Sequence, residues 1–233
     1  MSLLWQSFEQ ADKFRGMLIS PFPDSVGFAV INIAQADESK ISSQEQDIAS
    51  RITNIHRRSH FIAGRIAARK AIASKGFPNT NEILKAENGM PIWPAGLIGS
   101  ISHTTDTAVA CVTLRSSFQI ISLDIEEKTR EIRDDIARRI LTEDEQAWLC
   151  EEAQPENQLL CVFSAKECVY KGLYPICLTT MNFKDVELHF DKTENKFTAK
   201  LLKSFHSSLQ VGMTFVINCS ADEQFLLTSL VIP

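Results

Sequence analysis

The sequence lacks the features of membrane and secreted proteins. Its longest apolar runs, such as residues 225–231, are far shorter than the about 18 residues that a membrane-spanning helix needs. The N-terminal residues contain no basic segment followed by an apolar block, so the sequence predicts no secretion signal. We therefore expect a cytoplasmic protein.

Closely spaced cysteine pairs are absent, so the spacing of cysteine does not suggest metal binding or cross-linking. The six cysteines include no Cys-x-x-Cys pair and lie within apolar or helical patterns, which favours reduced, buried thiols over zinc ligands or disulfides. They are Cys111, Cys150, Cys161, Cys168, Cys177 and Cys219. An excess of positive charge is also missing. The formal net charge of −5 argues against general affinity for nucleic acids, but not against a local basic groove.

What is present is the composition of an ordinary globular protein, with 44% hydrophobic and 23% charged residues. A chain of 233 residues has room for one domain or two small ones. Strand and helix signals occur in both halves, so we expect an α+β fold. It would be a pseudo-two-fold duplication of two α/β subdomains, residues 1–118 and 119–233, each with a small, mostly antiparallel sheet packed against a long helix.

The first half is predicted to contain strands at residues 26–33 and 107–114. Between them, residues 42–45 have the spacing of a capping box and predict the start of a long helical segment. This segment has at most one break and ends near residues 76–78. Residues 88–94, with two prolines and a glycine, predict an irregular loop.

The second half is predicted to contain one strand, then helices, then further strands. The helices are expected at residues 130–140, at 142–153 with a capping box of Thr142 and Glu145, and, after a polar break at 151–157, from residue 163 to Gly172 and Pro175. The strands are expected at residues 120–125, 186–190, 197–202, 213–219 and 225–232.

Two acidic residues lie at the end of the strand predicted at 120–125. Asp124 and Glu126 are two positions apart, so on an extended backbone both side chains leave the same face, while Leu123 and Ile125 point into a core. Such a carboxylate pair suits Mg²⁺, which commonly takes one or two protein carboxylates, waters and phosphate oxygens as ligands. The alternative is an exposed strand edge that simply carries acids.

A basic stripe and a run of small residues indicate contacts with phosphate. Arg58, Arg65 and Arg69 are seven and four positions apart, which places them within about 40° of one another on a helix. Arginine forks often bind phosphate, although a solvated helix face is the alternative. Residues 99–104 include small residues whose backbone N–H groups could approach an anion, with a further hydrogen bond from His103. Alternatively, this segment only closes a strand.

Taken together, five segments resemble the 4′-phosphopantetheinyl transferases of the larger, monomeric kind, most of all the enterobactin-synthesis type. That family shows, in order, a Gly-Arg helix, a Gly-x-Pro loop, a Ser-His pair, a Gly-x-Asp-x-Glu strand end and a Trp-Ser-x-Lys-Glu-x-x-x-Lys helix. This chain has, in the same order, Gly64-Arg65, Gly89-Met90-Pro91, Ser102-His103, Leu123-Asp124-Ile125-Glu126 and Phe163-Ser164-Ala165-Lys166-Glu167 through Lys171. The resemblance covers roughly residues 57–175.

Three positions depart from the family pattern. Phe163 replaces the usual tryptophan, which should preserve the packing, and Ser122 lies near where a glycine is common. Met90 lies where many members carry a lysine or arginine beside the phosphates of the nucleotide. That cationic contact is therefore missing, or it is supplied by Arg57 or Arg58.

The resemblance implies Mg²⁺-dependent transfer of the phosphopantetheine arm of coenzyme A to a serine of an apo acyl or peptidyl carrier protein, with 3′,5′-ADP leaving. Asp124, Glu126 and Glu167 would bind the metal ion, for which Mn²⁺ is an alternative. Glu167 would also be the base for the serine, directly or through a metal-bound water, and Lys171 would meet the charge that develops on the pyrophosphate. Contacts with coenzyme A are expected from Arg58, Arg65, Arg69, Ser102, His103, Asp124, Lys166 and Lys171.

The same resemblance implies siderophore, nonribosomal peptide, polyketide or fatty-acid synthesis as the pathway. Each half of the chain would provide one wall of the ligand site. A basic patch after the metal strand would dock the acidic carrier, unless it only balances neighbouring acids. It comprises Lys128, Arg130, Arg133, Arg138 and Arg139.

Other functions remain open at this point. A different Mg²⁺-dependent nucleotide phosphodiesterase would use the same acids without a carrier, and a non-catalytic protein that binds coenzyme A or a carrier would not need Glu167 or Lys171. These residues also have a structural explanation. Ser164 and Glu167 have the spacing of a capping box, and Glu167 with Lys171 forms a favourable i,i+4 pair.

Overall fold

The computed structural model describes residues 18–77, 82–150, 155–191, 193–194 and 196–233. The chain forms two compact units, which we call the N-terminal unit (Phe22–Leu123, with Val231–Pro233) and the C-terminal unit (Asp124–Leu230, with the described residues 18–21). The boundary between them follows Leu123, whereas the sequence suggested a boundary after residue 118.

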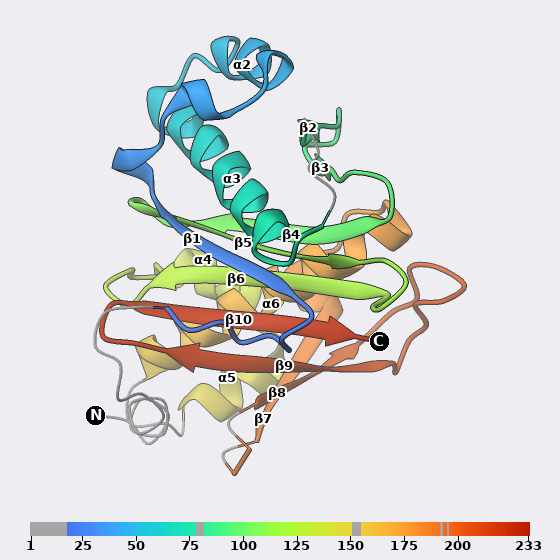
Figure 1. Ribbon diagram of the computed structural model, residues 1–233. Helices are drawn as coiled ribbons and strands as arrows, with labels where there is room; N and C mark the ends of the chain where they lie inside the picture. Colours follow the sequence, from blue (N-terminus) through green and yellow to red (C-terminus); the bar gives the residue numbers. More distant parts are fainter. Residues whose placement is uncertain (1–17, 78–81, 151–154, 192, 195) are drawn as a thin grey trace. The chain divides into compact units, whose positions relative to one another are not determined.

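The N-terminal unit is a three-stranded antiparallel sheet covered by one long helix (Figure 1). The sheet has the order β1-β5-β4, formed by β1 (Gly27–Asn32), β5 (Thr107–Leu114) and β4 (Leu97–His103). The predicted central position of β5 is confirmed. Helix α3 (Ile55–Ser74) packs against all three strands and buries alanines and isoleucines on them. The core of this unit lies between α3 and the sheet.

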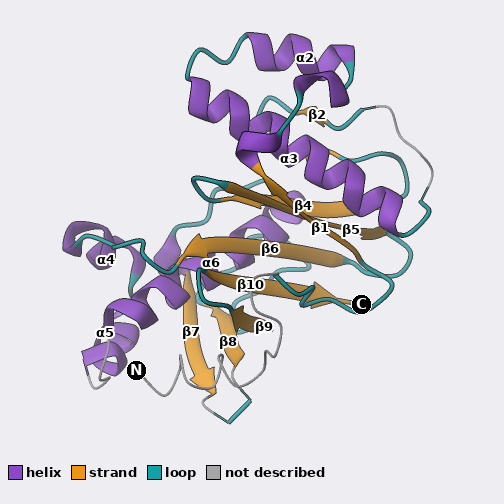
Figure 2. Cartoon of the chain, turned by 60° about the vertical axis from the view of Figure 1, so that its left-hand side comes forward, coloured by secondary structure: helices purple, strands orange, loops and turns teal. Residues whose placement is uncertain are grey.

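The predicted helical segment with one break is confirmed. Helix α2 (Ser43–Ser50) begins with a capping box, in which the Glu45 N–H donates to Ser42 Oγ at 3.2 Å and the Ser42 N–H donates to Glu45 Oε2 at 2.8 Å. After the break, Asn54 caps α3 by accepting the N–H of Arg57. In both ribbon views α2 lies beyond α3 from the sheet (Figure 2). Two short 3-10 helices, η1 (Ile33–Gln35) and η2 (Glu38–Lys40), precede α2.

The prediction of an irregular loop at residues 88–94 is wrong in part. Strands β2 (Leu84–Lys85) and β3 (Pro91–Ile92) pair with each other as a short antiparallel hairpin. Pro91 is compatible with this pairing because it is the first residue of its strand.

Residues 99–103 belong to β4, so the alternative that this segment closes a strand is confirmed, and contact of its backbone with an anion stays a prediction. Gly99 serves packing here. A Cβ atom at this position would lie 2.3 Å from the Cys111 carbonyl oxygen and 2.7 Å from the Trp93 ring. The small residue therefore admits an indole and a neighbouring strand.

The C-terminal unit contains a second long helix and most of a five-stranded sheet, of which the first residues of β6 and the last of β10 belong to the N-terminal unit. The sheet has the order β6-β10-β9-β8-β7, formed by β6 (Ile120–Glu127), β10 (Phe225–Ile232), β9 (Thr214–Ala221), β8 (Lys196–Leu201) and β7 (Val186–Asp191). Helix α6 (Pro155–Cys177) packs against β9, β8 and β7. The predicted α+β class, with antiparallel pairing and one long helix in each unit, is confirmed, whereas the pseudo-two-fold relation stays a prediction.

The helices of this unit differ from the predicted bounds. Helix α4 (Asp134–Ile140) is shorter than predicted, and α5 (Glu143–Cys150) begins with the predicted capping box of Thr142 and Glu145. Residues 151–154 of the predicted polar break lie outside the described residues. Residues 155–157 are helical, so the break is wrong there. Helix α6 starts at a proline, which is favoured at the first helical position, and continues past Gly172 and Pro175.

None of the helices in the described part of the chain is long and apolar enough to cross a membrane. All six cysteines lie among the described residues, and none of them forms a disulfide there. The expectation that they are buried is wrong for Cys150, which is exposed at the end of α5, and holds only in part for Cys177, which is partly buried.

Candidate functional site

Asp124 on β6 is a buried carboxylate with two different partners. Its side chain is only 4% exposed. Its Oδ1 accepts a hydrogen bond from Lys171 Nζ at 2.6 Å, and its Oδ2 accepts one from Ser164 Oγ at 2.8 Å. The Ser164 hydroxyl also lies 2.9 Å from the Thr228 hydroxyl. Helix α6 therefore directs two polar side chains at the same carboxylate.

This arrangement contradicts the capping-box explanation of Ser164 and Glu167. Because α6 begins at Pro155, Ser164 lies inside the helix and caps nothing. Its hydroxyl bonds to a residue 40 positions earlier in the chain. The spacing was a coincidence of sequence.

Glu126 lies two residues beyond Asp124 and is paired with an arginine. Both of its carboxylate oxygens accept hydrogen bonds from Arg130 Nη1, at 2.6 and 2.5 Å. The guanidinium carbon of Arg130 lies 4.6 Å from the centre of the Phe163 ring. The phenylalanine that replaces the family tryptophan therefore still provides an aromatic surface beside the acids. The exposed strand edge considered from the sequence is wrong, because Glu126 is buried.

The electrostatics link five residues, Asp124, Glu126, Arg130, Glu167 and Lys171, which we call the β6–α6 cluster. Burial and repulsion from Asp124 raise the pKa of Glu126 to about 7, against the opposing effect of Arg130 and Lys171. Burial also raises the pKa of Glu167, with Lys171 and Arg130 opposing and Asp124 adding to the shift. Burial would lower the pKa of Lys171, but Asp124 and Glu167 raise it overall.

The chemistry of the β6–α6 cluster fits a hard divalent cation, since its donors are carboxylate oxygens. Within the described residues, however, no group of three His, Cys, Asp or Glu side chains is placed to hold a metal ion as it stands. Arg130 and Lys171, whose side chains are 45% and 25% exposed, would have to release Glu126 and Asp124 first. Metal binding by Asp124, Glu126 and Glu167 therefore stays a prediction.

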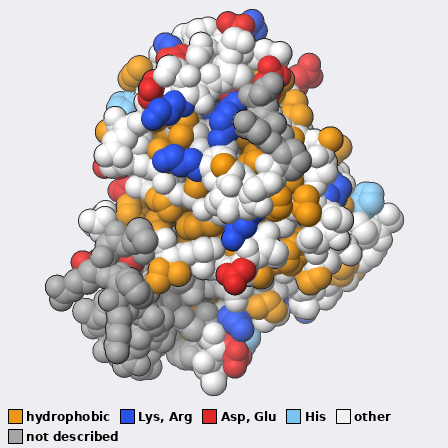
Figure 3. Space-filling model, viewed as in Figure 1, with side chains coloured by type: hydrophobic (Ala, Val, Ile, Leu, Met, Phe, Trp, Pro, Cys, Tyr) orange, Lys and Arg blue, Asp and Glu red, His pale blue; other side chains and the backbone are white. Residues whose placement is uncertain are grey.

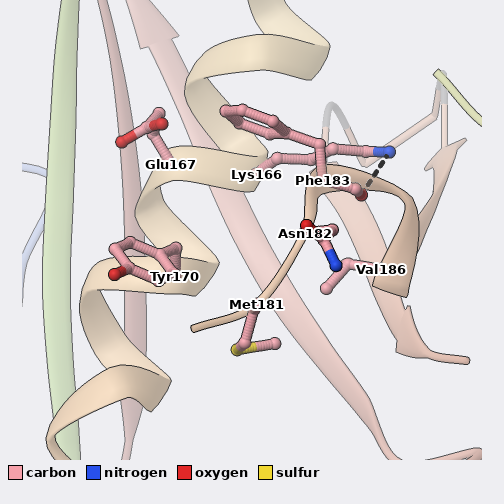
Figure 4. A pocket seen from close by; sticks show the side chains of 7 residues that line it. All are labelled: Lys166, Glu167, Tyr170, Met181, Asn182, Phe183 and Val186. Carbon is pink, nitrogen blue, oxygen red and sulfur yellow. Dashed lines mark hydrogen bonds between the residues drawn. The ribbon is translucent and has the colours of Figure 1, made fainter. Parts of the chain in front are cut away.

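A pocket of about 210 Å³ lies beside Glu167 (Figure 4). Its lining residues are Lys166, Glu167, Tyr170, Met181, Asn182, Phe183 and Val186. Glu167 and Tyr170 project from the same side of α6, and the segment that follows the helix supplies the other wall. Most of that wall is apolar, so the pocket combines an acid at one end with a hydrophobic surface.

Lys166 points away from Glu167 and into the protein (Figure 4). Its Nζ donates to the Ile140 carbonyl at 2.8 Å, to Glu145 Oε2 at 2.6 Å and to the Phe183 carbonyl at 3.0 Å. An ammonium group has three N–H bonds, so these acceptors engage all of them. Burial lowers the pKa of Lys166, and Glu145 opposes that shift. A contact with coenzyme A would break this set of bonds.

Two of the three arginines on α3 form ion pairs within the N-terminal unit. Arg58 binds both carboxylate oxygens of Glu38 at 2.8 Å in a half-exposed pair, and Arg69 donates to the buried Glu45 at 2.5 Å. The stripe that the sequence predicts is therefore present on the helix. The stripe is neither an open phosphate site nor a face that only water contacts, because the guanidinium groups of Arg58 and Arg69 each bind a carboxylate of the protein.

Arg65 is the most buried of these arginines, at 6% exposed. It donates to the Ile83 carbonyl at 2.6 Å and to the Leu84 carbonyl at 3.3 Å, and its guanidinium carbon lies 4.4 Å from the centre of the Phe61 ring. Burial lowers its pKa to about 10, with Glu45 opposing. Arg65 thus ties α3 to the segment that leads into β2.

The Ser-His pair ends strand β4. Ser102 is buried, whereas His103 is exposed and stacks on His60 of α3, with 4.1 Å between the ring centroids. Basic side chains stand out over the N-terminal unit on the face that shows α3 (Figure 3). Met90, at the position of a frequent cation, has its N–H bonded to Asn88 Oδ1 in the β2–β3 turn.

Part of the basic patch proposed for carrier docking is engaged locally. Arg130 binds Glu126, and Arg133 forms an exposed pair with Asp135 at 3.3 Å. This supports the alternative that the patch balances neighbouring acids. Docking through it stays a prediction.

The sequence reasoning missed several residues of these sites. The Arg130–Glu126 contact has i,i+4 spacing, which is a usable signal. Tyr170 was detectable because it lies three positions, almost one helical turn, after Glu167. The pocket wall from Met181 to Val186 and the His60 contact depend on tertiary packing, which local pattern does not report.

Comparison with known proteins identifies the family. The model of the 4′-phosphopantetheinyl transferase N-terminal domain matches residues 44–113, and that of the 4′-phosphopantetheinyl transferase superfamily matches residues 121–224. Enterobactin synthase component D of Salmonella typhi is 31% identical over 191 residues, which cover 74% of this chain and 78% of the relative. The chain belongs to the 4′-phosphopantetheinyl transferase superfamily.

A further relative agrees with this, and one solved structure shows a weaker likeness. The 4′-phosphopantetheinyl transferase Npt of Nocardia iowensis is 32% identical over 157 residues, which cover 66% of this chain and 68% of the relative. A solved structure, a holo-(acyl-carrier-protein) synthase from Bacillus anthracis in complex with CoA (3′,5′-ADP), is 24% identical and covers 39% of this chain and 94% of its own, with a TM-score of 0.33. The resemblance that the five motifs indicated is confirmed, and the chain is a transferase.

Proposed function

We propose that this transferase moves the 4′-phosphopantetheine arm of coenzyme A onto a serine hydroxyl of an apo acyl or peptidyl carrier protein. Family membership supports the reaction class. The β6–α6 cluster is the observation that supports specific roles for individual residues. In it, Asp124 is bonded by Ser164 and Lys171, and Glu167 lines a pocket. A purely structural ion pair would not need the third carboxylate.

In this proposal Asp124, Glu126 and Glu167 hold Mg²⁺, or Mn²⁺ in its place. When bound, the ion supplies positive charge that stabilises the negative charge of the reacting pyrophosphate. Lys171 has a raised pKa and stays protonated at neutral pH. Once it leaves Asp124, its ammonium group can bind a phosphate oxygen and stabilise the charge that develops there.

Glu167 is the proposed base for the carrier serine. Burial raises its pKa, which makes the carboxylate a stronger base. The serine oxygen forms a bond to the β-phosphorus, and the bond from that phosphorus to the oxygen bridging to the α-phosphate breaks. The serine proton passes to Glu167, and 3′,5′-ADP leaves with the electron pair of the broken bond.

The pocket beside Glu167 is proposed to hold the pantetheine arm. Met181, Phe183 and Val186 offer an apolar surface to its methylene and methyl groups, and Tyr170 and Asn182 offer polar groups to its amides and hydroxyl. Pockets with mostly apolar walls and a few polar groups are typical of small-molecule sites. The reacting phosphate would then lie at the Glu167 end.

The nucleotide end of coenzyme A is proposed to contact Arg58, Ser102 and His103 of the N-terminal unit. Arg58 is the best placed of the α3 arginines, because its pair with Glu38 is half-exposed and such pairs are weak, so a phosphate can compete for it. Arg65 and Arg69 bond to buried partners and contribute mainly by fixing α3. We leave Lys166 out of the binding site for the same reason.

The test is to incubate the protein with coenzyme A, Mg²⁺ and an apo carrier domain and to weigh the carrier by mass spectrometry. We expect the mass of one phosphopantetheine arm to be added. A siderophore-synthesis carrier is the first choice, because several relatives are enterobactin synthase components. Hydrolysis of coenzyme A without a carrier would instead indicate a phosphodiesterase, and unchanged coenzyme A and carrier would indicate a binding protein.

Asp124→Asn tests the residue assignment. Asparagine keeps a partner for the Ser164 hydroxyl but loses the charge, so we expect transfer to fall at least about 100-fold, on the scale of losing one key electrostatic contact. Asp135→Asn, at an exposed acid on α4, is the control and should transfer normally. Wild-type turnover by the Asp124 variant would refute the role of the cluster. A monomeric state and a cytoplasmic location also stay predictions.

A further inference from the structure

Arg130 engages both oxygens of a carboxylate that the proposed function assigns to the metal ion. It lies three residues after the end of β6, in a turn where its backbone N–H donates to the Glu127 carbonyl at 2.9 Å. Its Nη1 donates to Glu126 Oε1 at 2.6 Å and to Glu126 Oε2 at 2.5 Å. A cation that approaches either oxygen therefore meets the positive charge of the guanidinium at hydrogen-bond distance.

An aromatic ring holds the guanidinium in this place. The guanidinium carbon of Arg130 lies 4.6 Å from the centroid of the Phe163 ring on α6, a distance at which an aromatic face attracts a cation. Phe163 in turn packs against Phe183, with 5.7 Å between the ring centroids. Arg130 is thus fixed between an acid of β6 and a ring of α6, both within the C-terminal unit.

The two partners of this ion pair differ in exposure. The side chain of Arg130 is 45% exposed, whereas that of Glu126 is 8% exposed. The guanidinium can turn outward into water at a small cost. The buried carboxylate stays in place and then needs another positive partner, because an unpaired buried charge is costly. An exchangeable cation on a fixed carboxylate is the arrangement in which an incoming metal ion competes with the protein's own charge.

The charge of the incoming ion decides whether it can replace Arg130. At equal distance, the attraction between a cation and a carboxylate is proportional to the charge of the cation. A monovalent ion such as K⁺ brings only the charge that Arg130 already supplies. A divalent ion brings twice that charge, and Asp124, whose charge repels that of Glu126, attracts it as well. Competition from Arg130 therefore favours divalent over monovalent cations.

We propose that Arg130 competes with the metal ion for Glu126, and that this competition sets the affinity of the β6–α6 cluster for divalent ions and excludes monovalent ones. The inference rests on the proposed function, which places the metal ion at this cluster. It gives Arg130 a role in metal selectivity, beyond the carrier docking that the sequence suggested for it.

The experiment measures Mn²⁺ binding to the whole chain at neutral pH, through the electron paramagnetic resonance signal of the free ion. We expect Arg130→Gln to bind Mn²⁺ at least about fivefold more tightly than wild type, on the scale of one partly exposed ion pair. Loss of Arg130 also makes Glu126 easier to protonate. A divalent ion, however, gains twice as much as a proton when the same neighbouring charge is removed.

Arg133→Gln is the matched control. It removes the same charge from the same segment, but Arg133 pairs with the exposed Asp135 at 3.3 Å, so Mn²⁺ affinity should stay within about twofold of wild type at physiological ionic strength. Arg130→Met is a second test variant, because its apolar side chain can still pack on Phe163. It should bind Mn²⁺ as tightly as Arg130→Gln, so the test does not depend on one variant folding.

Exchange of the background salt tests the selectivity. When KCl replaces tetramethylammonium chloride at equal ionic strength, Mn²⁺ binding should weaken in the Arg130 variants and stay unchanged in wild type. Arg130 variants that bind Mn²⁺ no more tightly than wild type, or an equal effect of K⁺ on wild type and variants, would overturn the inference alone. If neither wild type nor any variant binds Mn²⁺, the metal site of the proposed function is overturned together with the inference.

Discussion

Each unit anchors its long helix with a buried capping-box glutamate, but the two anchors differ in their cation. In the N-terminal unit, Glu45 accepts the Ser42 N–H, the Ile83 N–H and a hydrogen bond from Arg69 of α3. The carboxylate thereby joins a short helix, the long helix and the approach to a strand.

The C-terminal unit repeats this pattern of bonds. Glu145 accepts the Thr142 N–H at 2.8 Å, the Leu188 N–H at 2.7 Å and a hydrogen bond from Lys166 of α6. Again one carboxylate joins a short helix, the long helix and a strand. The repetition is consistent with the predicted duplication of two α/β subdomains.

The difference lies in burial and position. The Lys166 side chain is 1% exposed, whereas that of Arg69 is 21% exposed, so water reaches only the second pair. Lys166 also directly precedes Glu167, the proposed base. The same type of anchor thus serves stability in one unit, and in the other it also orients the segment of α6 that carries the proposed base.

Replacing the cation of each anchor should show the difference between the two anchors most clearly. Lys166→Met leaves the carboxylate of Glu145 buried without its counter-ion, and we expect a loss of about 3–5 kcal/mol in the free energy of unfolding. Arg69→Met should cost less, about 1–3 kcal/mol, because water can reach the remaining carboxylate of Glu45. Urea unfolding followed by circular dichroism measures both. Equal losses would contradict the distinction.

A double variant separates a lost charge from lost packing. If the cost of Lys166→Met comes from the unpaired carboxylate, adding Glu145→Gln should recover part of the stability, because the buried group is then neutral. No recovery would indicate that Lys166 acts through its methylene chain.

The pH dependence of stability should distinguish Glu126 from the anchor residues Glu45 and Glu145. Glu126 is bonded by Arg130, whose side chain is 45% exposed. The folded protein raises the pKa of Glu126 from 4.5 to about 7 and therefore holds a proton that the unfolded chain releases. The proton on Glu126 contributes its full stability below the pKa of this group in the unfolded chain. The contribution is lost as the pH rises through the pKa of Glu126 in the folded protein. Without metal, we expect wild type to lose on the order of 2 kcal/mol between about pH 5 and about pH 8.

Glu126→Gln is the corresponding variant, and it should flatten the profile because glutamine does not titrate. Thermal unfolding at a series of pH values measures this. If the variant loses stability with pH as steeply as wild type, the pH dependence comes from other groups, such as Glu167, whose pKa is also raised.

The capping hydroxyls should give the smallest effects, and equal ones. Ser42 accepts the Glu45 N–H at 3.2 Å and Thr142 accepts the Glu145 N–H at 3.3 Å, so the two caps are alike in geometry. We expect Ser42→Ala and Thr142→Ala each to cost about 1 kcal/mol. Unequal costs in urea unfolding would show that the anchors differ in more than their cations.

Local sequence signals predicted these caps because each is formed within four residues. The same signal failed at Ser164 and Glu167, where the spacing is present but α6 begins at Pro155. The Ser164 hydroxyl bonds to Asp124, and no local pattern reports a partner so distant in the chain.

The arginines of α3 show the same limit. Helical periodicity predicted that Arg58, Arg65 and Arg69 share a face, and they do lie on one helix. Their bonding depends on partners such as Glu38 and Glu45, which belong to other elements. The five motifs predicted the family because they occur in the family's order along the chain. The burial of Lys166 could not be predicted in this way, because it depends on the residues that pack around it in the folded protein.

The two ion pairs at the end of β6 have a consequence for how the protein is made. Arg130 and Lys171 neutralise Glu126 and Asp124 from within the chain, so adjacent carboxylates can be buried during synthesis without an external cation. The polypeptide can therefore fold with these carboxylates already paired. Under the proposed function, metal and substrate would later replace counter-ions that the chain itself supplies.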